Sequence, residues 1–218
     1  MDPAIESLQP ALRAAITQLA LDVSGAQADA LLAFLTLLRR WNAHYNLTAV
    51  RDPAQMLVQH LVDCLAVIEP LRGKISALPA RLLDVGSGGG LPGVVIAIID
   101  PLIDVTCVDT VGKKAAFVQQ VASELRLPNL HSQHSRVEQL KAAPFDVVTS
   151  RAFASLGDFT RLTRHHLLPV GVWMAMKGKV PTDELALLSD AVDVFHVEQI
   201  AVPGLDADRC VAWMRPAH

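Results

Sequence analysis

The stretch Leu82-Leu83-Asp84-Val85-Gly86-Ser87-Gly88-Gly89-Gly90-Leu91-Pro92-Gly93 decides the fold of this chain. Its first four residues have the character of a short buried strand, which stops at a glycine-rich turn. The apolar run that follows, residues 94–99, predicts a helix or a continued core segment. Glycines let the backbone turn sharply and approach a ligand, and the start of the following helix offers N–H groups. Strand, glycine turn and helix together predict a nucleotide-binding cradle.

Length and composition are typical of a single globular domain. The chain has 218 residues, of which 51% are hydrophobic, and its net charge of −3 argues against a protein that simply coats nucleic acid. No secretory signal is visible and no apolar stretch reaches the roughly 18 residues of a membrane span, so we expect a cytoplasmic protein. Cys64, Cys107 and Cys210 are widely spaced in apolar surroundings. This pattern favours buried thiols over disulfides, and we expect no metal site.

The apolar spacing changes near residue 80. Helical spacing covers residues 4–20 and 26–45, and Asp52-Pro53 indicates the start of a third helix that runs to about residue 68. Prolines and a glycine then interrupt the chain before the glycine turn. The expected parts are an N-terminal helical extension, residues 1–78, and a core domain, residues 79–218.

Strand and helix patterns alternate in the second part. The strand candidates are residues 81–85, 104–109, 130–135, 145–150, 171–176, 192–198 and 209–214. The helix candidates between the first five strands are residues 92–99, 112–126, 136–141 and 155–168. This alternation predicts an α/β fold with a mostly parallel seven-stranded sheet covered on both faces. Only a loop separates the last two strands, which predicts an antiparallel hairpin at one edge.

Two nucleotide cofactors fit the glycine pattern to different degrees. Gly88-x-Gly90-x-x-Gly93 matches the dinucleotide pattern, a weak signal that leaves a nicotinamide-dependent dehydrogenase as an alternative. Gly86-x-Gly88-x-Gly90 directly after Asp84 fits the Rossmann-like site for S-adenosylmethionine better. Asp84 could face the amino group of that cofactor, and Asp109 could accept hydrogen bonds from both ribose hydroxyls. The structural alternative to a cofactor site is a glycine turn that only connects the strand to the helix and binds no ligand.

The residues at the end of the fourth strand and the positions of the cysteines argue against two classes of base methyltransferase. Methyltransferases of exocyclic base amines carry Pro-Pro-aromatic there, whereas this chain has Thr149-Ser150-Arg151. Methylation of pyrimidine C5 needs a cysteine nucleophile, but Cys107 lies inside the second strand. A ring nitrogen such as guanine N7 has its own lone pair, so its orientation toward the methyl group is the main requirement. Orientation can supply roughly 7–11 kcal/mol.

A series of motifs occurs in order along nearly the whole chain. They are Trp41-Asn42-x-x-Tyr45-Asn46-Leu47-Thr48-Ala49-Val50-Arg51, His60-Leu61-Val62-Asp63, Gly90-Leu91-Pro92-Gly93, Lys113-Lys114, Arg136-Val137-Glu138, Phe145-Asp146, Ser150-Arg151-Ala152 and Lys177-Gly178. Together they closely resemble the RsmG family, also called GidB. The resemblance implies a class I S-adenosylmethionine-dependent methyltransferase core with an N-terminal helical extension. It also implies methylation of N7 of a guanine, conventionally guanine 527, in the 530 loop of bacterial 16S rRNA.

The same resemblance implies roles for individual residues. Gly86 and Leu91 would contact the cofactor, Val137 and Glu138 would lie beside its adenine, and Arg151 would close the site. With the glycine pattern, the candidate cofactor-binding residues are Asp84, Gly86, Gly88, Gly90, Leu91, Asp109, Val137, Glu138 and Arg151. Gly89 stands where many relatives have Ala or Pro, which predicts a looser loop that keeps the site.

Arg151 is the candidate catalytic residue, although a cation beside a sulfonium is unfavourable. We expect it to hold the methionine carboxylate, an RNA phosphate or guanine O6. A bidentate grip on O6 and N7 is excluded during transfer, because it would occupy the reacting lone pair. A structural ion pair is the alternative. His60 and Asp63 share a helix face at i and i+3 and are expected to form a structural pair.

Six polar residues are candidates for contact with RNA: Asn46, Thr48, Lys113, Lys114, Arg164 and Lys177. Asn46 could equally be a turn or cap residue, and the two adjacent lysines could be a solvated helix start. Residues 151–180 carry five basic residues and one acid, which predicts a local basic face, with scattered solvated charges as the alternative. Trp41 and Tyr45 follow helical spacing and are expected in the core.

The resemblance thus implies a methyltransferase that acts on 16S rRNA, in the 30S subunit or an assembly intermediate, and we expect it to be a cytoplasmic monomer. The alternative within the same fold is a methyltransferase of another RNA or of a small molecule.

Overall fold

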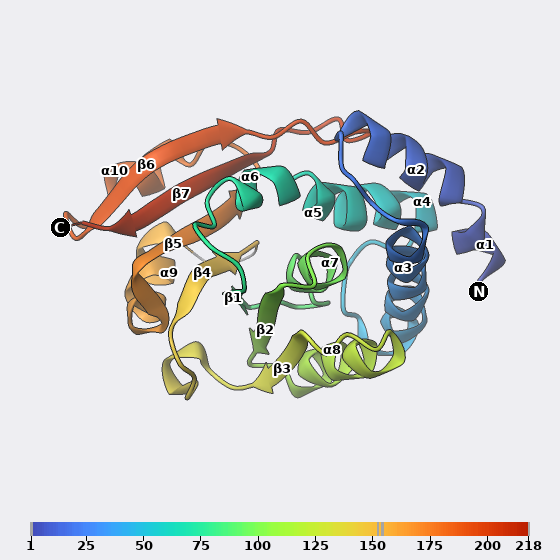
Figure 1. Cartoon of the computed structure of the whole chain (residues 1–218), viewed down its shortest axis with the longest axis horizontal. Coiled ribbons are helices and arrows are strands. Elements are labelled where there is room, and N and C mark those ends of the chain that lie inside the picture. Colours follow the sequence, from blue (N-terminus) through green and yellow to red (C-terminus); the bar gives the residue numbers. More distant parts are fainter. Residues whose placement is uncertain (1, 152, 154, 218) are drawn as a thin grey trace.

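Figure 1 shows the computed structural model of the chain, which describes residues 2–151, 153 and 155–217. Seven strands form one sheet in the order β3-β2-β1-β4-β5-β7-β6. They are β1 Ala80–Val85, β2 Ile103–Asp109, β3 Leu130–His134, β4 Phe145–Ser150, β5 Leu167–Lys177, β6 Val192–Gln199 and β7 Cys210–Pro216. β1 to β5 are parallel, and β7 runs antiparallel between β5 and β6. The predicted mostly parallel sheet with an antiparallel hairpin at one edge is confirmed.

Helices cover both faces of this sheet (Figure 1). The covering helices are α3 Gly25–Tyr45, α7 Gly93–Ile99, α8 Gly112–Glu124 and α9 Leu156–Thr163. α3, α7 and α8 share one hydrophobic core with the face of β1 that presents Leu82. α9 packs on the opposite face, where Leu83 points. Strands of a parallel sheet are apolar on both sides, so both faces need such cover.

The strand order creates a crevice at the carboxyl end of β1. β1 pairs with β2 on one side and with β4 on the other. The helix after β1 covers one face of the sheet and the helix after β4 covers the other. Ligands of open α/β sheets bind at such a switch point, beyond the carboxyl ends of the strands. The glycine turn and Asp109 both lie at this edge.

Apart from α3, the helices before the sheet are shorter than the sequence predicts. Besides α3 they are α1 Pro3–Glu6, α2 Gln9–Gln18, α4 Pro53–Met56, the π-helix η1 Leu57–Val62, α5 Asp63–Leu65 and α6 Ile68–Arg72. The helix expected at 4–20 is divided, because Pro10 lacks the N–H that a continuous helix needs. The helix expected at 53–68 changes its hydrogen-bonding pattern at η1. The helix expected at 26–45 is confirmed as α3, which starts with a capping box of Ser24 and Gln27.

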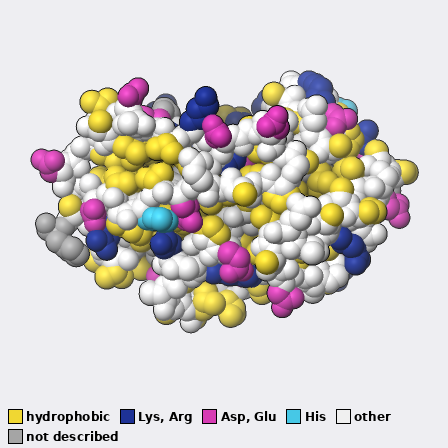
Figure 2. All heavy atoms as spheres, turned by 90° about the horizontal axis from the view of Figure 1, so that it is seen from above, with side chains coloured by type: hydrophobic (Ala, Val, Ile, Leu, Met, Phe, Trp, Pro, Cys, Tyr) yellow, Lys and Arg dark blue, Asp and Glu magenta, His cyan; other side chains and the backbone are white. Residues whose placement is uncertain are grey.

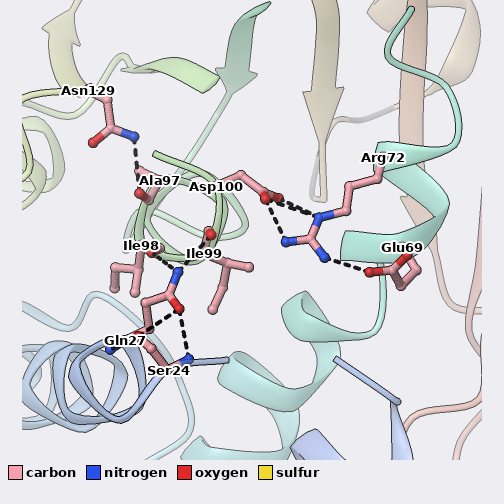
Figure 3. Close-up of polar contacts among 9 residues, drawn as sticks. All are labelled: Ser24, Gln27, Glu69, Arg72, Ala97, Ile98, Ile99, Asp100 and Asn129. Carbon is pink, nitrogen blue, oxygen red and sulfur yellow. Dashed lines mark hydrogen bonds and ion pairs between the residues drawn. The ribbon is translucent and has the colours of Figure 1, made fainter. Parts of the chain in front are cut away.

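The N-terminal helices also hold the C-terminal end of α7, which is buried along its whole length. Gln27 Nε2 of α3 donates hydrogen bonds to the carbonyl oxygens of Ile98 at 3.1 Å and Ile99 at 2.8 Å (Figure 3). The last carbonyls of a helix have no partner within it, so a buried helix end needs donors from elsewhere. Arg72 of α6 binds Asp100, the residue after α7, through Nε and Nη2. The helix that follows the glycine turn is therefore fixed by both parts of the chain.

Two helix predictions in the second part need correction. Residues 136–141 form only one 3-10 turn, η2 Val137–Gln139, because two apolar residues at i and i+3 fit such a turn as well as a helix. The helix expected at 155–168 stops at Thr163, since the turn η3 Arg164–His166 follows and β5 begins at Leu167. The short helix α10 Thr182–Ala186 lies between β5 and β6. Within the described part of the chain, no helix has the length and apolar character needed to cross a membrane.

Candidate functional site

Three glycines of the turn after β1 have a left-handed backbone. The φ angles of Gly86, Gly88 and Gly90 are +66°, +58° and +79°, which residues with a Cβ rarely adopt. At Gly90 a Cβ would also lie 2.5 Å from Cγ2 of Val94. At Gly86 a Cβ would meet no atom within 4 Å. The turn is therefore tight on its inner side and open at Gly86, as a ligand cradle requires.

Asp84 lies beneath the glycine turn. Its side chain is fully buried, and Oδ2 accepts a hydrogen bond from the backbone N–H of Gly93 at 2.9 Å. Burial raises the pKa of Asp84 to about 7, against the opposing effects of the Gly93 N–H and the charge of Arg151. Oδ1 has no hydrogen-bond partner among the described residues. Asp84 thus holds the first residue of α7, and its contact with a cofactor amino group stays a prediction.

Gly93 lets α7 approach the sheet closely. A Cβ there would lie 2.5 Å from Sγ of Cys107 and 2.9 Å from Oδ2 of Asp84. The thiol of Cys107 is fully enclosed, and burial raises its pKa well above the usual value. Burial also raises the pKa of Cys64 and Cys210. Since the thiolate is the reactive form, none of the three cysteines suits the role of nucleophile.

Asp109 joins the glycine turn to the start of α8. Its Oδ2 accepts a hydrogen bond from the N–H of Gly88, and its Oδ1 accepts one from the N–H of Val111, both at 2.9 Å. A carboxylate offers about four lone-pair sites, so acceptor capacity remains for two hydroxyl groups. The geometry suits the ribose contact predicted for this residue.

A depression of about 400 Å³, which we call the glycine cleft, lies at this edge of the sheet. Gly86, Asp109, Val137 and Glu138 all line it, as expected for residues around one cofactor. An adenosyl group fits these residues: a carboxylate for ribose hydroxyls, the buried Val137 for the base, and open space at Gly86. Leu91 is buried in the core and does not line the cleft.

A second depression, the arginine pocket, measures about 350 Å³ and is lined by residues of η1, α5 and the ends of β5 and β7. Asp63, only 3% exposed, lies in its wall between two arginines. Its Oδ2 accepts from Nη1 of Arg151 at 3.2 Å, and its Oδ1 accepts from Nε of Arg209 at 2.7 Å. Arg151 also donates to the carbonyl oxygen of Gln59 at 3.0 Å. Arg151 thus forms an ion pair, as the structural alternative for this residue predicted. It lines the arginine pocket and not the glycine cleft.

His60 lies in the wall of the arginine pocket, where its side chain is buried. Burial, and then the charge of Arg151, lowers the pKa of His60 to about 4, so the ring is neutral at neutral pH. Its Nε2 forms a hydrogen bond with Oγ1 of Thr48 at 2.9 Å. The predicted pair with Asp63 is wrong, because Asp63 binds the arginines instead and a π-helical turn alters the angular spacing between the two residues.

The loop after α3 uses its predicted RNA-binding residues for its own structure. Thr48 N–H donates to Oδ1 of Asn42 at 2.9 Å, and Thr48 Oγ1 accepts from the N–H of Val50 at 3.2 Å. Asn46 closes α3 as a left-handed cap, with φ 50° and ψ 56°, in agreement with the alternative given for it. Tyr45 is 43% exposed, so its predicted place in the core is wrong. The helix ends at this residue, and its ring packs on Trp41 while its outer side stays exposed.

The predicted basic residues do not share one surface. Lys113 is exposed in the first turn of α8, and Lys114 lines the glycine cleft. Lys177 forms an ion pair with Glu184 at 2.9 Å. Arg164 precedes the start of β5 and lines neither depression. The predicted basic face is therefore divided. On the face of the molecule that Figure 2 presents, basic and acidic side chains are interspersed.

Arg209 and its contact with Asp63 were not predicted from the sequence. The two residues lie 146 positions apart, and no motif in a single sequence connects them. Ala152 of the Ser150-Arg151-Ala152 motif lies outside the described residues.

Comparison with known proteins decides the family. Residues 27–211 match the GidB family, described as rRNA small subunit methyltransferase G. The chain belongs to this family. Ribosomal RNA small subunit methyltransferase G of Leptothrix cholodnii is 62% identical over 194 residues, which cover 89% of each chain. The protein of the same name from Acidovorax ebreus is 60% identical over 218 residues, which cover 96% of each chain.

Solved structures agree on the fold of this GidB family member. TrmN from Thermus thermophilus has a TM-score of 0.56 at 16% identity, over 74% of this chain and 53% of that chain. A SAM-dependent methyltransferase from Aquifex aeolicus has a TM-score of 0.55 at 16% identity, over 75% of this chain and 93% of that chain. The fold is that of class I methyltransferases. Family membership and fold together identify the cofactor as S-adenosylmethionine.

Proposed function

We propose that this protein transfers a methyl group from S-adenosylmethionine to N7 of a guanine in the 530 loop of bacterial 16S rRNA, conventionally guanine 527. Membership of the GidB family supports the substrate class, and the motifs quoted above support the position. The observation that carries the mechanism is the adjacency of the two depressions. Ser150 Oγ donates to the carbonyl oxygen of Val85 at 2.9 Å. This contact joins the β1 end, beside the glycine cleft, to the β4 end that leads into Arg151 of the arginine pocket.

The glycine cleft is the proposed cofactor site. Asp109 would accept hydrogen bonds from the ribose hydroxyls, while Val137 and Glu138 would lie beside the adenine. Gly86 would leave room for the rest of the cofactor, with Gly88, Gly90 and Leu91 shaping the turn beneath. When bound there, S-adenosylmethionine supplies an electrophilic methyl group on a positively charged sulfur.

The arginine pocket is the proposed place of the guanine. A paired A-form helix hides N7 in its narrow groove, so the base must be splayed out of its loop to reach the pocket. N7 would attack the methyl group with its own lone pair, so the reaction needs neither a thiolate nucleophile nor a strong base. The enclosed thiols of the three cysteines are consistent with this. His60 is neutral in the pocket wall because its pKa is lowered to about 4, so it adds no charge that would oppose the positive charge forming on N7.

Arg151 would orient the guanine or an anion beside it. Its Nη1 is held by Asp63 and the Gln59 carbonyl, which leaves other guanidinium N–H groups for an acceptor such as guanine O6 or a carboxylate. The carboxylate of Asp63 compensates part of its charge, which reduces repulsion of the sulfonium. A single hydrogen bond to O6 leaves the N7 lone pair available.

The proposed partner is the 16S rRNA within the 30S subunit or an assembly intermediate, bound by one copy of the chain in the cytoplasm. Lys114 and Lys177, which line the two depressions, and Lys113 beside Lys114 would contact its phosphates, whereas Arg164 would serve another segment. We assign cofactor chemistry to residues 79–218 and substrate positioning in part to residues 1–78.

The test is methyl transfer from labelled S-adenosylmethionine to 30S subunits from cells that lack this gene, followed by mapping of the label. We expect label on N7 of the 530-loop guanine. Label on another nucleotide would contradict the assigned position, and label only on another RNA or a small molecule would favour the alternative. In a parallel thermal-shift assay, S-adenosylmethionine but not NAD should raise the Tm.

A further inference from the structure

Tyr45 is an exposed aromatic ring that no step proposed above uses. At 43% it is the most exposed Phe, Tyr or Trp side chain among the described residues. Its ring packs on that of Trp41, with centroids 5.1 Å apart, and Trp41 in turn packs on Phe117 of α8 at 5.5 Å. The ring is therefore supported from beneath and open to solvent outside. A ring held in this way loses little conformational entropy when a flat ligand stacks on it.

The chain that follows Tyr45 leads to the wall of the arginine pocket. Thr48 follows it by three residues and touches His60 of the pocket wall at 2.9 Å. Three residues span at most about 11 Å, so the backbone of Tyr45 lies within that distance of Thr48. Farther back in α3, Leu38 lies against the glycine turn, where a Cβ on Gly89 would be 3.0 Å from its Cδ1. Tyr45 is thus connected to the wall of the proposed guanine site through three residues of chain and the Thr48–His60 hydrogen bond.

A basic side chain is bonded to the residue that follows Tyr45. Arg51 is exposed, and its Nη2 donates to Oδ1 of Asn46, the residue after Tyr45, at 3.0 Å. The acid beside it, Asp52, is engaged as the cap of α4 through the N–H of Gln55 at 2.9 Å. The other N–H groups of the Arg51 guanidinium are available for an anion. An exposed aromatic ring and a cation bonded to the next residue of the chain suit a nucleotide, which has a flat base and a charged phosphate.

We propose that Tyr45 is a stacking platform for an unpaired rRNA base next to the target guanine, and that Arg51 binds a phosphate of the same strand. This inference rests on the proposed function, because it requires an RNA loop splayed open at the arginine pocket. When one base leaves its stack, its neighbour is exposed and gains from a new stacking partner. Stacking tolerates any base, so the platform contributes affinity and position, not base identity.

The test compares KM and kcat for 30S subunits among Tyr45 variants. Tyr45→Phe keeps the ring and should stay within about twofold of the unmodified protein. Tyr45→Ala and Tyr45→Leu should raise KM about 5- to 150-fold, with kcat at saturating 30S and the Kd for S-adenosylmethionine little changed. Tyr45→Leu retains apolar packing on Trp41, so a rise in KM with an unchanged Tm separates stacking from misfolding. Unchanged KM in both, or an equal rise in Tyr45→Phe, would overturn the platform.

Arg51 is tested by salt dependence. Arg51→Gln should lower the slope of log KM against log salt concentration by about 0.7, the value for one phosphate contact on a single strand. Arg51→Lys should retain the slope. An unchanged slope in Arg51→Gln would contradict the phosphate contact.

The identity of the partner is tested by a photoreactive benzoylphenylalanine at position 45. A cross-link to 16S rRNA near the methylated guanine supports the proposal, whereas a cross-link to a ribosomal protein, or none, contradicts it. The methylation assay distinguishes failure of the proposed function from failure of the stacking platform. A protein that methylates no guanine N7 refutes the proposed function, while an active protein whose KM is insensitive to Tyr45→Ala refutes only the platform.

Discussion

The carboxylate of Asp109 links the fold to the cofactor site. It ends β2, holds the N–H of Gly88 in the glycine turn and the N–H of Val111 before α8, and lines the glycine cleft. The turn is therefore fixed before a ligand arrives, which reduces the ordering cost of binding.

Asp109→Ala should lower the affinity for S-adenosylmethionine about ten- to over a hundredfold, because a charged hydrogen-bond acceptor contributes about 1.5–3 kcal/mol. Isothermal titration calorimetry measures the change. Asp104 is the matched control, since it lies near the amino end of the same strand, is 43% exposed and pairs with His131. Asp104→Ala should bind the cofactor normally, and equal affinity in both variants would contradict the ribose contact.

His60 predicts a change of stability with pH. Its pKa is about 4 in the folded protein and 6.5 when unperturbed. The contribution of the neutral ring to the free energy of unfolding is therefore fully present above pH 6.5. The contribution is lost as pH falls through 4, because the unfolded chain takes up the proton first, and the loss is on the order of 3 kcal/mol. His60→Gln, which can still bond to Thr48, should lose less free energy of unfolding between pH 7 and 4 in urea titrations. Parallel curves for the two proteins would show that the folded pKa is not lowered.

At the scale of elements, the glycine turn and α7 form one unit. Asp84 binds the first residue of α7, and Gln27 and Arg72 hold its end. Gly93 is the point where this helix meets the sheet.

Gly93→Ala should destabilise the fold by about 1–3 kcal/mol, because its Cβ would lie 2.5 Å from Sγ of Cys107 and 2.9 Å from Oδ2 of Asp84, both in the packed core. Gly89→Ala is the control. Its Cβ would meet only the flexible end of Leu38, at 3.0 Å, and its effect should stay below about 1 kcal/mol. Thermal and urea unfolding give both values, and similar losses in the two variants would contradict the role of Gly93.

Elements with a strong local signal could be predicted from the sequence, and those set by tertiary contacts could not. The glycine turn and α3 follow from glycine spacing and from a capping box with a long apolar repeat. The turn at Val137–Gln139 and the π-helix η1 are short, and periodicity over so few residues does not separate one helix type from another. Tyr45 followed the helical repeat, but the repeat does not reveal that the helix ends before its ring is covered.

For the whole molecule, strand order decides which parts of the site could be predicted. Parallel strands bring the ends of β1, β2 and β4 to one edge, so Gly86, Asp109 and Arg151 could be expected near one another. The wall of the arginine pocket could not be predicted, because there Asp63 binds Arg209, which lies 146 residues away in the sequence. The helices before the sheet supply that carboxylate and so complete the arginine pocket.

Arg151→Ala should lower kcat/KM on 30S subunits about 10- to 150-fold, the value of a charge-assisted hydrogen bond, with a smaller fractional loss of stability. Asp63 keeps its bond to Arg209 at 2.7 Å, so the buried carboxylate is not left without a partner. Arg161→Ala, which removes an exposed pair with Asp158, is the control and should change neither property. Equal losses of activity and stability in Arg151→Ala would assign the residue a structural role only.

The most direct test of the account is an experimental structure of the protein with S-adenosylhomocysteine and guanosine monophosphate. We expect the adenosyl group in the glycine cleft with its ribose on Asp109, its sulfur directed toward the arginine pocket, and the guanine in that pocket beside Arg151. An adenosyl group in the arginine pocket, or a guanine bound away from Arg151, would contradict it.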